Sequence, residues 1–258
     1  MMERHKTGEL EEKMDQYWAK RSKSYSEQNL AQLEKPQREI WKNLILDHAP
    51  KKKCLNILDV GTGPGFFAIL LAMAGHRVTA VDRNENMLKE ARKNAKTYGV
   101  KIEFIQVEGE LPFEDQTFDL IVSRDVTWTL TDPENTMLHW MSKVKEGGCL
   151  QYFDANWNSH LLSEESKKEH EIYQEYVKKQ KGFYYSKAKE LDPIAENLPM
   201  TYRDRPAWDA AFWLKHNYAY VCTICHLNSQ IYTEVEQMQY RQKPEFLMII
   251  ENRIRGEE

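Results

Sequence analysis

The chain has 258 residues and a formal net charge of −4, and 41% of its residues are hydrophobic. This length can bury a large core within one domain, and the small negative charge provides no basic field that would attract nucleic acid or an anionic membrane. No apolar stretch approaches transmembrane length, and residues 1–5 lack the apolar segment of a signal peptide. We therefore expect a cytoplasmic protein, a monomer or homodimer, with neither a nucleic-acid nor a membrane partner.

The first fifty residues predict two helices. The first covers residues 9–20, and the second covers residues 27–47 with an apolar stripe at helical spacing. Pro36 can break or kink the second helix because proline lacks an N–H group.

A strand, a glycine loop and a helix follow one another after this region. Residues 55–60 predict a buried strand and residues 66–73 an apolar helix. Between them, Gly61, Gly63 and Gly65 let the backbone turn sharply and approach a ligand closely, because glycine has no Cβ. The helix start adds free amide donors, so this turn predicts a ligand site.

A carboxylate at the end of the next strand indicates the kind of ligand. Residues 76–81 predict a second strand that ends at Asp82, which is 21 residues after Gly61 (82 − 61). An acid about 20 residues into a βαβ unit binds a ribose diol. A dinucleotide fingerprint would need a third glycine at position 66, where the chain has Phe66.

Two further motifs lie downstream: residues 111–123 read LPFEDQTFDLIVS, and residues 144–150 read VKEGGCL. Together with Asp59 and the G-x-G-x-G loop, these blocks resemble, in order and spacing, the class I S-adenosylmethionine-dependent methyltransferases. The likeness is to their small-molecule branch, the ubiquinone or type 11/25 group, and it covers about residues 55–155.

The resemblance implies an α/β fold: a doubly wound, mostly parallel seven-stranded sheet with an antiparallel last strand, N-terminal helices and a helical cap insertion. Further strands are expected at residues 101–107, 118–123, 149–153, 218–226 and 245–251. Further helices are expected at residues 84–98, 132–145, 163–181 and 207–215. The expected division of this single domain is an N-terminal lid (1–50), a cofactor-binding core (51–157), a cap over the acceptor pocket (158–206) and the end of the sheet (207–258).

The implied function is transfer of a methyl group from S-adenosyl-L-methionine to a small-molecule acceptor, which leaves S-adenosyl-L-homocysteine. The acceptor atom, O, N, S or C, stays open. The alternative is a non-catalytic sensor or assembly protein that binds the same cofactor. Phe66 disfavours a nucleotide-dependent dehydrogenase, and the net charge disfavours a nucleic-acid methyltransferase.

The resemblance also implies the cofactor-binding residues. In the lid, Tyr17, Arg21 and Tyr25 match a segment that folds over the methionine end of the cofactor, although a solvated helix face explains them equally well. The family usually has an adenine-reading acid where this chain has Val107, so the loop would use either the following Glu108 or backbone groups. The remaining candidates are Asp59, Gly61, Thr62, Gly63, Gly65, Asp82, Arg83, Met87 and Arg124.

The acceptor is expected beyond the carboxyl ends of the later strands, where ligands of open α/β sheets bind. A base is needed there only if the acceptor must lose a proton, and the candidates are Asp125, Asp154 and His160. Four aromatic residues are expected to contact the acceptor: Trp128, Trp157, Tyr184 and Tyr185.

We expect no metal. Cys222, Cys225 and His226 match the haem-attachment pattern, but positions three apart on a predicted strand face opposite sides of the sheet. His160, Glu164 and His170 do not match a known ligand spacing, and a solvated helix face explains them.

Overall fold

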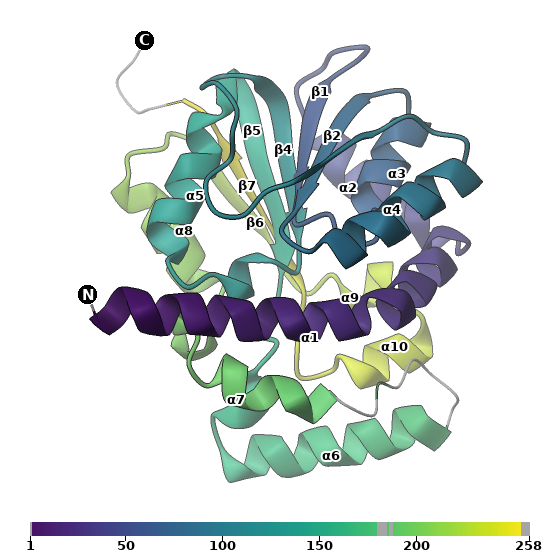
Figure 1. Ribbon diagram of the computed structural model, residues 1–258, viewed down its shortest axis with the longest axis vertical. Helices are drawn as coiled ribbons and strands as arrows, with labels where there is room; N and C mark the ends of the chain where they lie inside the picture. Colours follow the sequence, from purple (N-terminus) through teal and green to yellow (C-terminus); the bar gives the residue numbers. More distant parts are fainter. Residues whose placement is uncertain (1, 180–184, 186–187, 254–258) are drawn as a thin grey trace.

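The computed structural model describes residues 2–179, 185 and 188–253. Its centre is a seven-stranded sheet of order β3-β2-β1-β4-β5-β7-β6 (Figure 1). Only β7 is antiparallel to its neighbours, β5 and β6, so the predicted fold class is confirmed. The strands are β1 (Asn56–Val60), β2 (Arg77–Asp82), β3 (Glu103–Gln106), β4 (Phe118–Arg124), β5 (Val144–Asp154), β6 (Val221–Ile224) and β7 (Phe246–Glu251).

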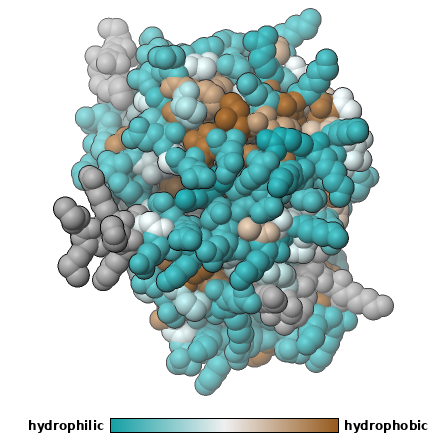
Figure 2. Space-filling view, viewed as in Figure 1, coloured by the Kyte–Doolittle hydropathy of each residue, from teal (hydrophilic) through white to brown (hydrophobic). Residues whose placement is uncertain are grey.

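Helices cover both faces of the sheet, which explains why the central strands are almost continuously apolar. One face packs around Trp41 and carries α2 (Gln37–Asp47), α3 (Phe66–Met73) and α4 (Glu85–Thr97). The other packs around Trp140 and Trp213 and carries α5 (Pro133–Ser142) and α8 (Ala207–Lys215). Figure 2 shows hydrophobic side chains gathered between α5 and α4, where the loop of residues 107–117 replaces a helix.

The strand order reverses at β1, which pairs with β2 on one side and with β4 on the other. Connections leave β1 and β4 in opposite directions, so the carboxyl ends of these strands border a crevice. Crevices of this kind are the ligand sites of open α/β sheets.

The N-terminal region differs from its prediction. One helix, α1 (Met2–Leu33), replaces the predicted helix 9–20 and the interruption after it, and the break falls instead around Pro36. Ser22 and Ser26 look like loop residues in the sequence but are buried, and Ser26 Oγ accepts a hydrogen bond from Asn94 Nδ2 of α4 at 2.9 Å. Packing against α4 therefore holds this polar segment in a helix.

Helix α1 crosses the carboxyl ends of the central strands, and the cap elements lie on its other side (Figure 1). An apolar cluster joins α1, the strand ends and the cap. Met14 and Tyr17 of α1 pack with Trp128 after β4 and with Ile194 and Leu198 of the cap. The cap and the remaining segments contain η1 (Thr127–Thr129), η2 (Ser159–Leu161), α6 (Glu164–Lys179), η3 (Ala188–Leu191), α7 (Asp192–Ala195), η4 (Pro199–Tyr202), α9 (Asn228–Ile231) and α10 (Glu234–Gln239).

The boundaries of three other elements differ from the predictions by three residues or more. Helix α5 ends at Ser142 rather than at residue 145, and β5 begins at Val144 rather than at residue 149. The predicted glycine turn lies inside β5, where a Cβ on Gly148 would meet the Asp119 carbonyl oxygen at 2.7 Å. Strand β6 is limited to Val221–Ile224.

None of the described helices combines the length and apolar character needed to cross a bilayer. Cys222 is half-buried and Cys225 exposed, and both are free thiols. No group of potential metal ligands occurs within residues 2–179, 185 and 188–253.

Two neighbouring residues of α8 test the packing. Trp213 is fully buried and donates from Nε1 to the Tyr152 hydroxyl at 3.0 Å, whereas Leu214 is 43% exposed. Trp213→Ala should lower the free energy of unfolding by about 3–5 kcal/mol, and Leu214→Ala should cost less than about 1 kcal/mol. Urea titration measures both, and equal losses would contradict this packing.

Candidate active site

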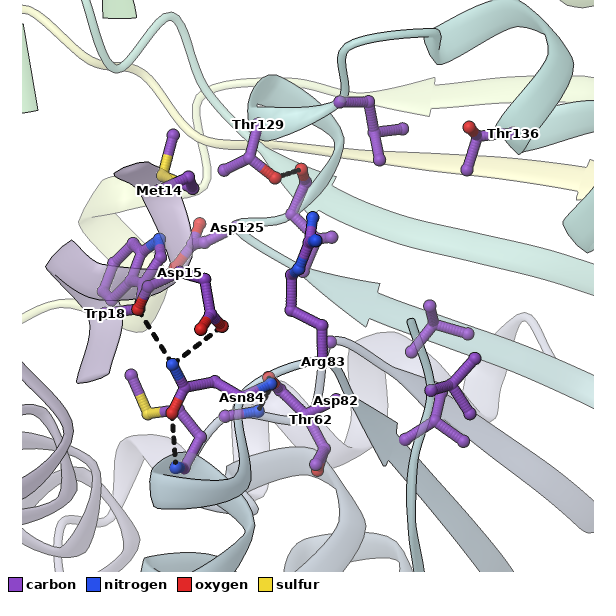
Figure 3. Close-up of a pocket in the computed structure, with 18 of the residues that line it drawn as sticks. Met14, Asp15, Trp18, Thr62, Asp82, Arg83, Asn84, Asp125, Thr129 and Thr136 are labelled. Atoms are coloured by element: carbon purple, nitrogen blue, oxygen red, sulfur yellow. Dashed lines mark hydrogen bonds between the residues drawn. The ribbon is translucent and has the colours of Figure 1, made fainter. Parts of the chain in front are cut away.

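A cavity of about 410 Å³ lies between α1 and the carboxyl ends of β1, β2 and β4. This volume lies in the range of small-molecule sites. Figure 3 shows side chains from α1, the glycine loop, the end of β2 and the loop after β4 around the same space. The cavity therefore occupies the crevice predicted by the strand order.

The glycine loop forms the floor of the cavity. Gly61 has φ +67°, and a Cβ on it would lie 2.3 Å from Val126 Cγ2 in the loop after β4. A side chain at this position would therefore be both strained and blocked.

Asp59 stabilises the conformation of the glycine loop. It is only 2% exposed, and its Oδ2 accepts hydrogen bonds from Thr62 Oγ1 at 2.6 Å and from Ala68 N at 3.0 Å. Burial raises the pKa of this carboxyl to about 7, against the effect of the two hydrogen bonds. Asp59 thus connects the loop to the first turn of α3.

Asp82 is fixed in a similar way at the end of β2. Its Oδ2 accepts from Gly63 N and its Oδ1 accepts from Asn84 N, both at 2.8 Å. Burial raises its pKa to about 6. Each carboxylate oxygen can accept a second hydrogen bond, so Asp82 is held rigidly and can still bind a diol.

Polar contacts tie α1 to the rim of the cavity. Asn84 Oδ1 caps α4 by accepting from Asn86 N at 2.9 Å, while Asn84 Nδ2 donates to the Asp15 side chain and carbonyl oxygen, both at 2.9 Å (Figure 3). Glu11 lies 3.6 Å from Arg83 and accepts from Thr131 Oγ1 at 2.8 Å. Helix α1 is therefore a wall of the cavity.

Arg124 and Asp125 end β4 on the other side of the glycine loop. Asp125 has φ +58° and an ion pair of 3.4 Å between its Oδ2 and Arg124 Nε. Burial raises the pKa of Asp125 to about 7, and Arg124 opposes this rise. The guanidinium of Arg124 lies 4.4 Å from the centre of the Trp41 ring and donates to Gln32 Oε1 at 2.9 Å. A non-glycine residue in the left-handed region at a cavity is typical of functional sites.

Most of the predicted cofactor residues line this cavity. They are Tyr25, Asp59, Gly61, Thr62, Gly63, Asp82, Arg83, Met87, Val107 and Arg124, joined by Asp125 from the acid–base candidates. Four others do not line it. Tyr17 is buried in the α1–cap cluster, and Arg21 donates to Ser24 and Gln28. Gly65 caps α3, and Glu108 is exposed beside Gln106.

Asp154 lies outside the cavity lining and is fully buried. Its Oδ1 accepts from Ala155 N and from Trp157 Nε1, both at 2.8 Å, and its Oδ2 accepts from Trp128 N at 2.9 Å. Arg205 Nη1 lies 2.9 Å from the same Oδ2. This carboxylate therefore supports the loops after β4 and β5.

The other predicted acceptor-side residues belong to the cap and its supports, outside the lining. His160 Nε2 lies 3.2 Å from Asp192 Oδ1, and its ring stacks on His170 at 4.4 Å. Trp128 is buried in the α1–cap cluster, and Trp157 packs edge-on against Tyr240. Tyr185 lies against the Arg21 guanidinium at 4.5 Å. Tyr184 lies outside the described residues.

The prediction from sequence missed one whole wall of the cavity. Seven residues of α1 line it, only one of which, Tyr25, was predicted; they are Leu10, Glu11, Met14, Asp15, Trp18, Tyr25 and Asn29. They recur at helical spacing, so a continuous helix through residues 21–26 would have revealed this face. At the opposite end, His139 Nε2 accepts from Leu111 N at 3.0 Å and lines the cavity beside Trp140.

A family model described as a methyltransferase domain matches residues 58–151. Residues 58–151 belong to this methyltransferase family. The matched range runs from β1 to β5 and contains the glycine loop, Asp82 and Asp125. The methyltransferase domain thus holds the floor and most of the rim of the cavity, while α1 comes from outside it.

Two curated relatives are similar to part of the chain. The ubiquinone biosynthesis O-methyltransferase of Rickettsia felis is 31% identical over 104 residues, 40% of this chain and 43% of that protein. The ubiquinone/menaquinone biosynthesis C-methyltransferase UbiE of an Enterobacter species is 32% identical over 117 residues, 43% of this chain and 47% of that protein. The chain thus spans less than half the length of these relatives.

A solved structure resembles nearly the whole chain. It is a candidate S-adenosyl-L-methionine-dependent methyltransferase from Methanococcus maripaludis, with a TM-score of 0.60 and 19% identity over 90% of this chain and 92% of that one. This likeness extends the shared fold beyond the methyltransferase domain to most of the chain.

Substitution of two glycines separates backbone strain from steric clash. Gly75 has φ +90° with nothing within 4 Å of an added Cβ, whereas Gly61 has the Val126 methyl groups in the way. Gly75→Ala should cost about 1 kcal/mol of unfolding free energy, and Gly61→Ala should cost clearly more. Val126→Ala added to Gly61→Ala should recover part of the difference in denaturant titrations; equal costs at both glycines would contradict the close approach.

Proposed function

We propose that the protein binds S-adenosyl-L-methionine in this cavity and transfers its methyl group to a small-molecule acceptor. The observation that carries the proposal is Asp82, a carboxylate held at the end of β2 by Gly63 N and Asn84 N within a methyltransferase domain. A rigid acceptor beside a glycine loop suits the ribose diol of an adenosyl cofactor.

The other lining residues suit the remaining parts of the cofactor. Met87 and Val107 provide apolar surface on the α4 side of Asp82, where the adenine would pack. On the opposite side, Arg124 lines the cavity, and its buried Nε makes no hydrogen bond to the part of the chain that the structure describes. A guanidinium with a free donor suits the methionine carboxylate.

This placement would leave the methyl group near Asp125. The methyl carbon of a sulfonium is already electrophilic, so the protein mainly has to hold the acceptor in line with the methyl–sulfur bond. The acceptor's lone pair forms the new bond, and the electrons of the methyl–sulfur bond stay on sulfur. The α1–cap cluster roofs the site and would exclude water as the positive charge leaves sulfur.

Asp125 is the one acid–base candidate from the sequence that lines the cavity. Because burial raises its pKa to about 7, its carboxylate can take a proton near neutral pH. Asp154 and His160 would act on the reaction only through the loops and the cap that they support.

Asp82→Ala should weaken S-adenosyl-L-methionine binding at least about tenfold, because hydrogen bonds to a charged group contribute about 1.5–3 kcal/mol each. The matched control is Glu146→Ala, which removes an exposed acid at the opposite end of the sheet. Titration calorimetry measures both affinities, and circular dichroism checks the fold. Wild-type affinity in a folded Asp82→Ala variant would contradict the ribose assignment, and binding without any formation of S-adenosyl-L-homocysteine from a metabolite extract would contradict catalysis.

Cofactor binding should release protons near pH 6. Burial raises the pKa of Asp82 to about 6. Donors from the ribose and the positive sulfonium stabilise the carboxylate, so its pKa should fall on binding, and the protein should lose protons. Calorimetry at pH 6 in two buffers of different ionisation enthalpy should detect this release, which should fade by pH 8.5. Proton uptake, or no linkage at pH 6, would contradict the assigned environment.

A further inference from the structure

The charged groups around the cavity are mostly acidic. Among the described residues, seven carboxylates and two guanidinium groups line it, and no lysine does. Neither arginine is left for the acceptor: Arg83 lies 3.6 Å from Glu11, and Arg124, 3.4 Å from Asp125, would bind the methionine carboxylate of the cofactor in the proposed function. The acids are Glu11, Asp15, Asp59, Asp82, Glu110, Asp125 and Asp132.

Most of these carboxylates have a partner that explains them. Asp59 and Asp82 accept backbone and hydroxyl hydrogen bonds of the glycine loop. Glu11 and Asp15 bind α1 to the rim, and Asp132 caps α5 by accepting from Asn135 N at 3.4 Å. These groups are therefore used by the fold or by the proposed ribose contact.

Asp125 keeps an unused acceptor. Its Oδ2 faces Arg124, but its Oδ1 is buried and accepts no hydrogen bond from the described residues. A buried polar atom without a partner costs about 1–3 kcal/mol, and the residue also holds a left-handed backbone conformation with φ +58°. A cationic donor would satisfy this oxygen.

Aromatic rings stand beside this carboxylate. Trp18 and Tyr25 of α1 line the same cavity, with ring centres 5.4 Å apart and planes tilted by 52°. Asp125 lies close enough to Tyr25 that its negative charge adds to the effect of burial on the tyrosine pKa, which is about 12. Figure 3 shows Trp18 and Asp125 on the same side of the cavity. A carboxylate beside aromatic rings is a setting that favours an organic cation.

We propose that the methyl acceptor is a cationic amine, held by the Asp125 carboxylate beside the rings of Trp18 and Tyr25. The inference rests on the proposed function and names its substrate class. Acceptors that carry a phosphate or carboxylate would be repelled by the acids. Once Arg124 holds the cofactor carboxylate and Arg83 pairs with Glu11, no basic side chain among the described lining residues would compensate for this repulsion.

The transfer step follows from this arrangement. The ammonium group gives one proton to the Asp125 carboxylate, and the freed nitrogen lone pair forms a bond to the methyl carbon. The carbon–sulfur bond breaks with its electron pair on sulfur, which gives S-adenosyl-L-homocysteine and a methylated ammonium ion. Asp125 then returns its proton to solvent.

A pair of probes with the same shape tests the charge preference. Choline has a positively charged nitrogen where 3,3-dimethyl-1-butanol has a neutral carbon. A difference in affinity between the two molecules therefore reports the effect of the charge. With the 258-residue chain saturated with S-adenosyl-L-homocysteine, calorimetry should show at least tenfold tighter binding of choline. Equal or tighter binding of the alcohol would overturn the proposal.

The variant Asp125→Asn identifies the residue responsible. Asparagine tolerates the left-handed conformation, so the variant should fold and keep its affinity for S-adenosyl-L-homocysteine while the preference for choline falls about tenfold or is lost. Glu146→Gln, which removes a distant exposed charge, should keep the full preference. A retained preference in Asp125→Asn, with affinity lost only for the positively charged S-adenosyl-L-methionine, would assign Asp125 to the sulfonium and overturn its role with the acceptor.

The proposed function and the proposed class of acceptor can be contradicted independently. A wild-type protein that does not bind S-adenosyl-L-homocysteine would contradict the proposed function itself. A protein that binds this product but shows no preference between choline and the alcohol would contradict only the cationic acceptor.

Discussion

The carboxylate of Asp82 connects three parts of the molecule. It accepts from Gly63 N in the glycine loop and from Asn84 N at the start of α4, and Asn84 in turn donates to Asp15 of α1. Loop, helix and outer wall thus share one short chain of hydrogen bonds. Keeping a carboxylate buried is unfavourable, as its raised pKa indicates, and a ligand that supplies further donors would relieve this cost.

A second buried network supports the acceptor side. Arg205, at the end of the cap, binds Asp209 through Nε and Nη2 at 2.9 and 2.8 Å and contacts Asp154 at 2.9 Å. All three side chains are fully buried, and Asp154 also holds the loop that contains Trp128. Removing one partner of such a buried pair leaves an uncompensated charge, which typically costs 3–5 kcal/mol. The cap and the strand ends are therefore held in one arrangement.

Local sequence patterns were enough to predict the first strands, the glycine loop and the position of Asp82, while the arrangement of the sheet came from the resemblance to the methyltransferases. Each depends on neighbours close in the chain: an apolar strand, a turn that needs glycine and an acid at a fixed distance. The α1 wall could not be predicted in this way, because the polar residues Ser22 and Ser26 are buried in the structure, and Ser26 contacts Asn94 of α4, which is distant in the sequence. Strand β5 begins at Val144, five residues earlier than the predicted residue 149 (149 − 144). It pairs with β4 on both sides of a register shift, and the glycine pair at this shift looks like a turn in the sequence.

Local sequence also could not predict which acid–base candidates would line the cavity. Asp125, Asp154 and His160 all follow strand ends in the sequence, yet only Asp125 lines the cavity. Asp154 points to Arg205 and Trp157, and His160 stacks on His170 within the cap. Several of their partners, Trp157, His170, Asp192 and Arg205, come from residues 157–205, a region without a recognisable motif, so their burial depends on contacts that no local pattern records.

A crystal structure of the 258-residue chain with S-adenosyl-L-homocysteine would test the account most directly. We predict both ribose hydroxyls within hydrogen-bond distance of Asp82, the adenine beside Met87 and Val107, and the sulfur facing the Asp125 side of the cavity beneath α1. A nucleoside bound away from Asp82, or a sulfur that faces the opposite end of the cavity beside His139, would contradict it.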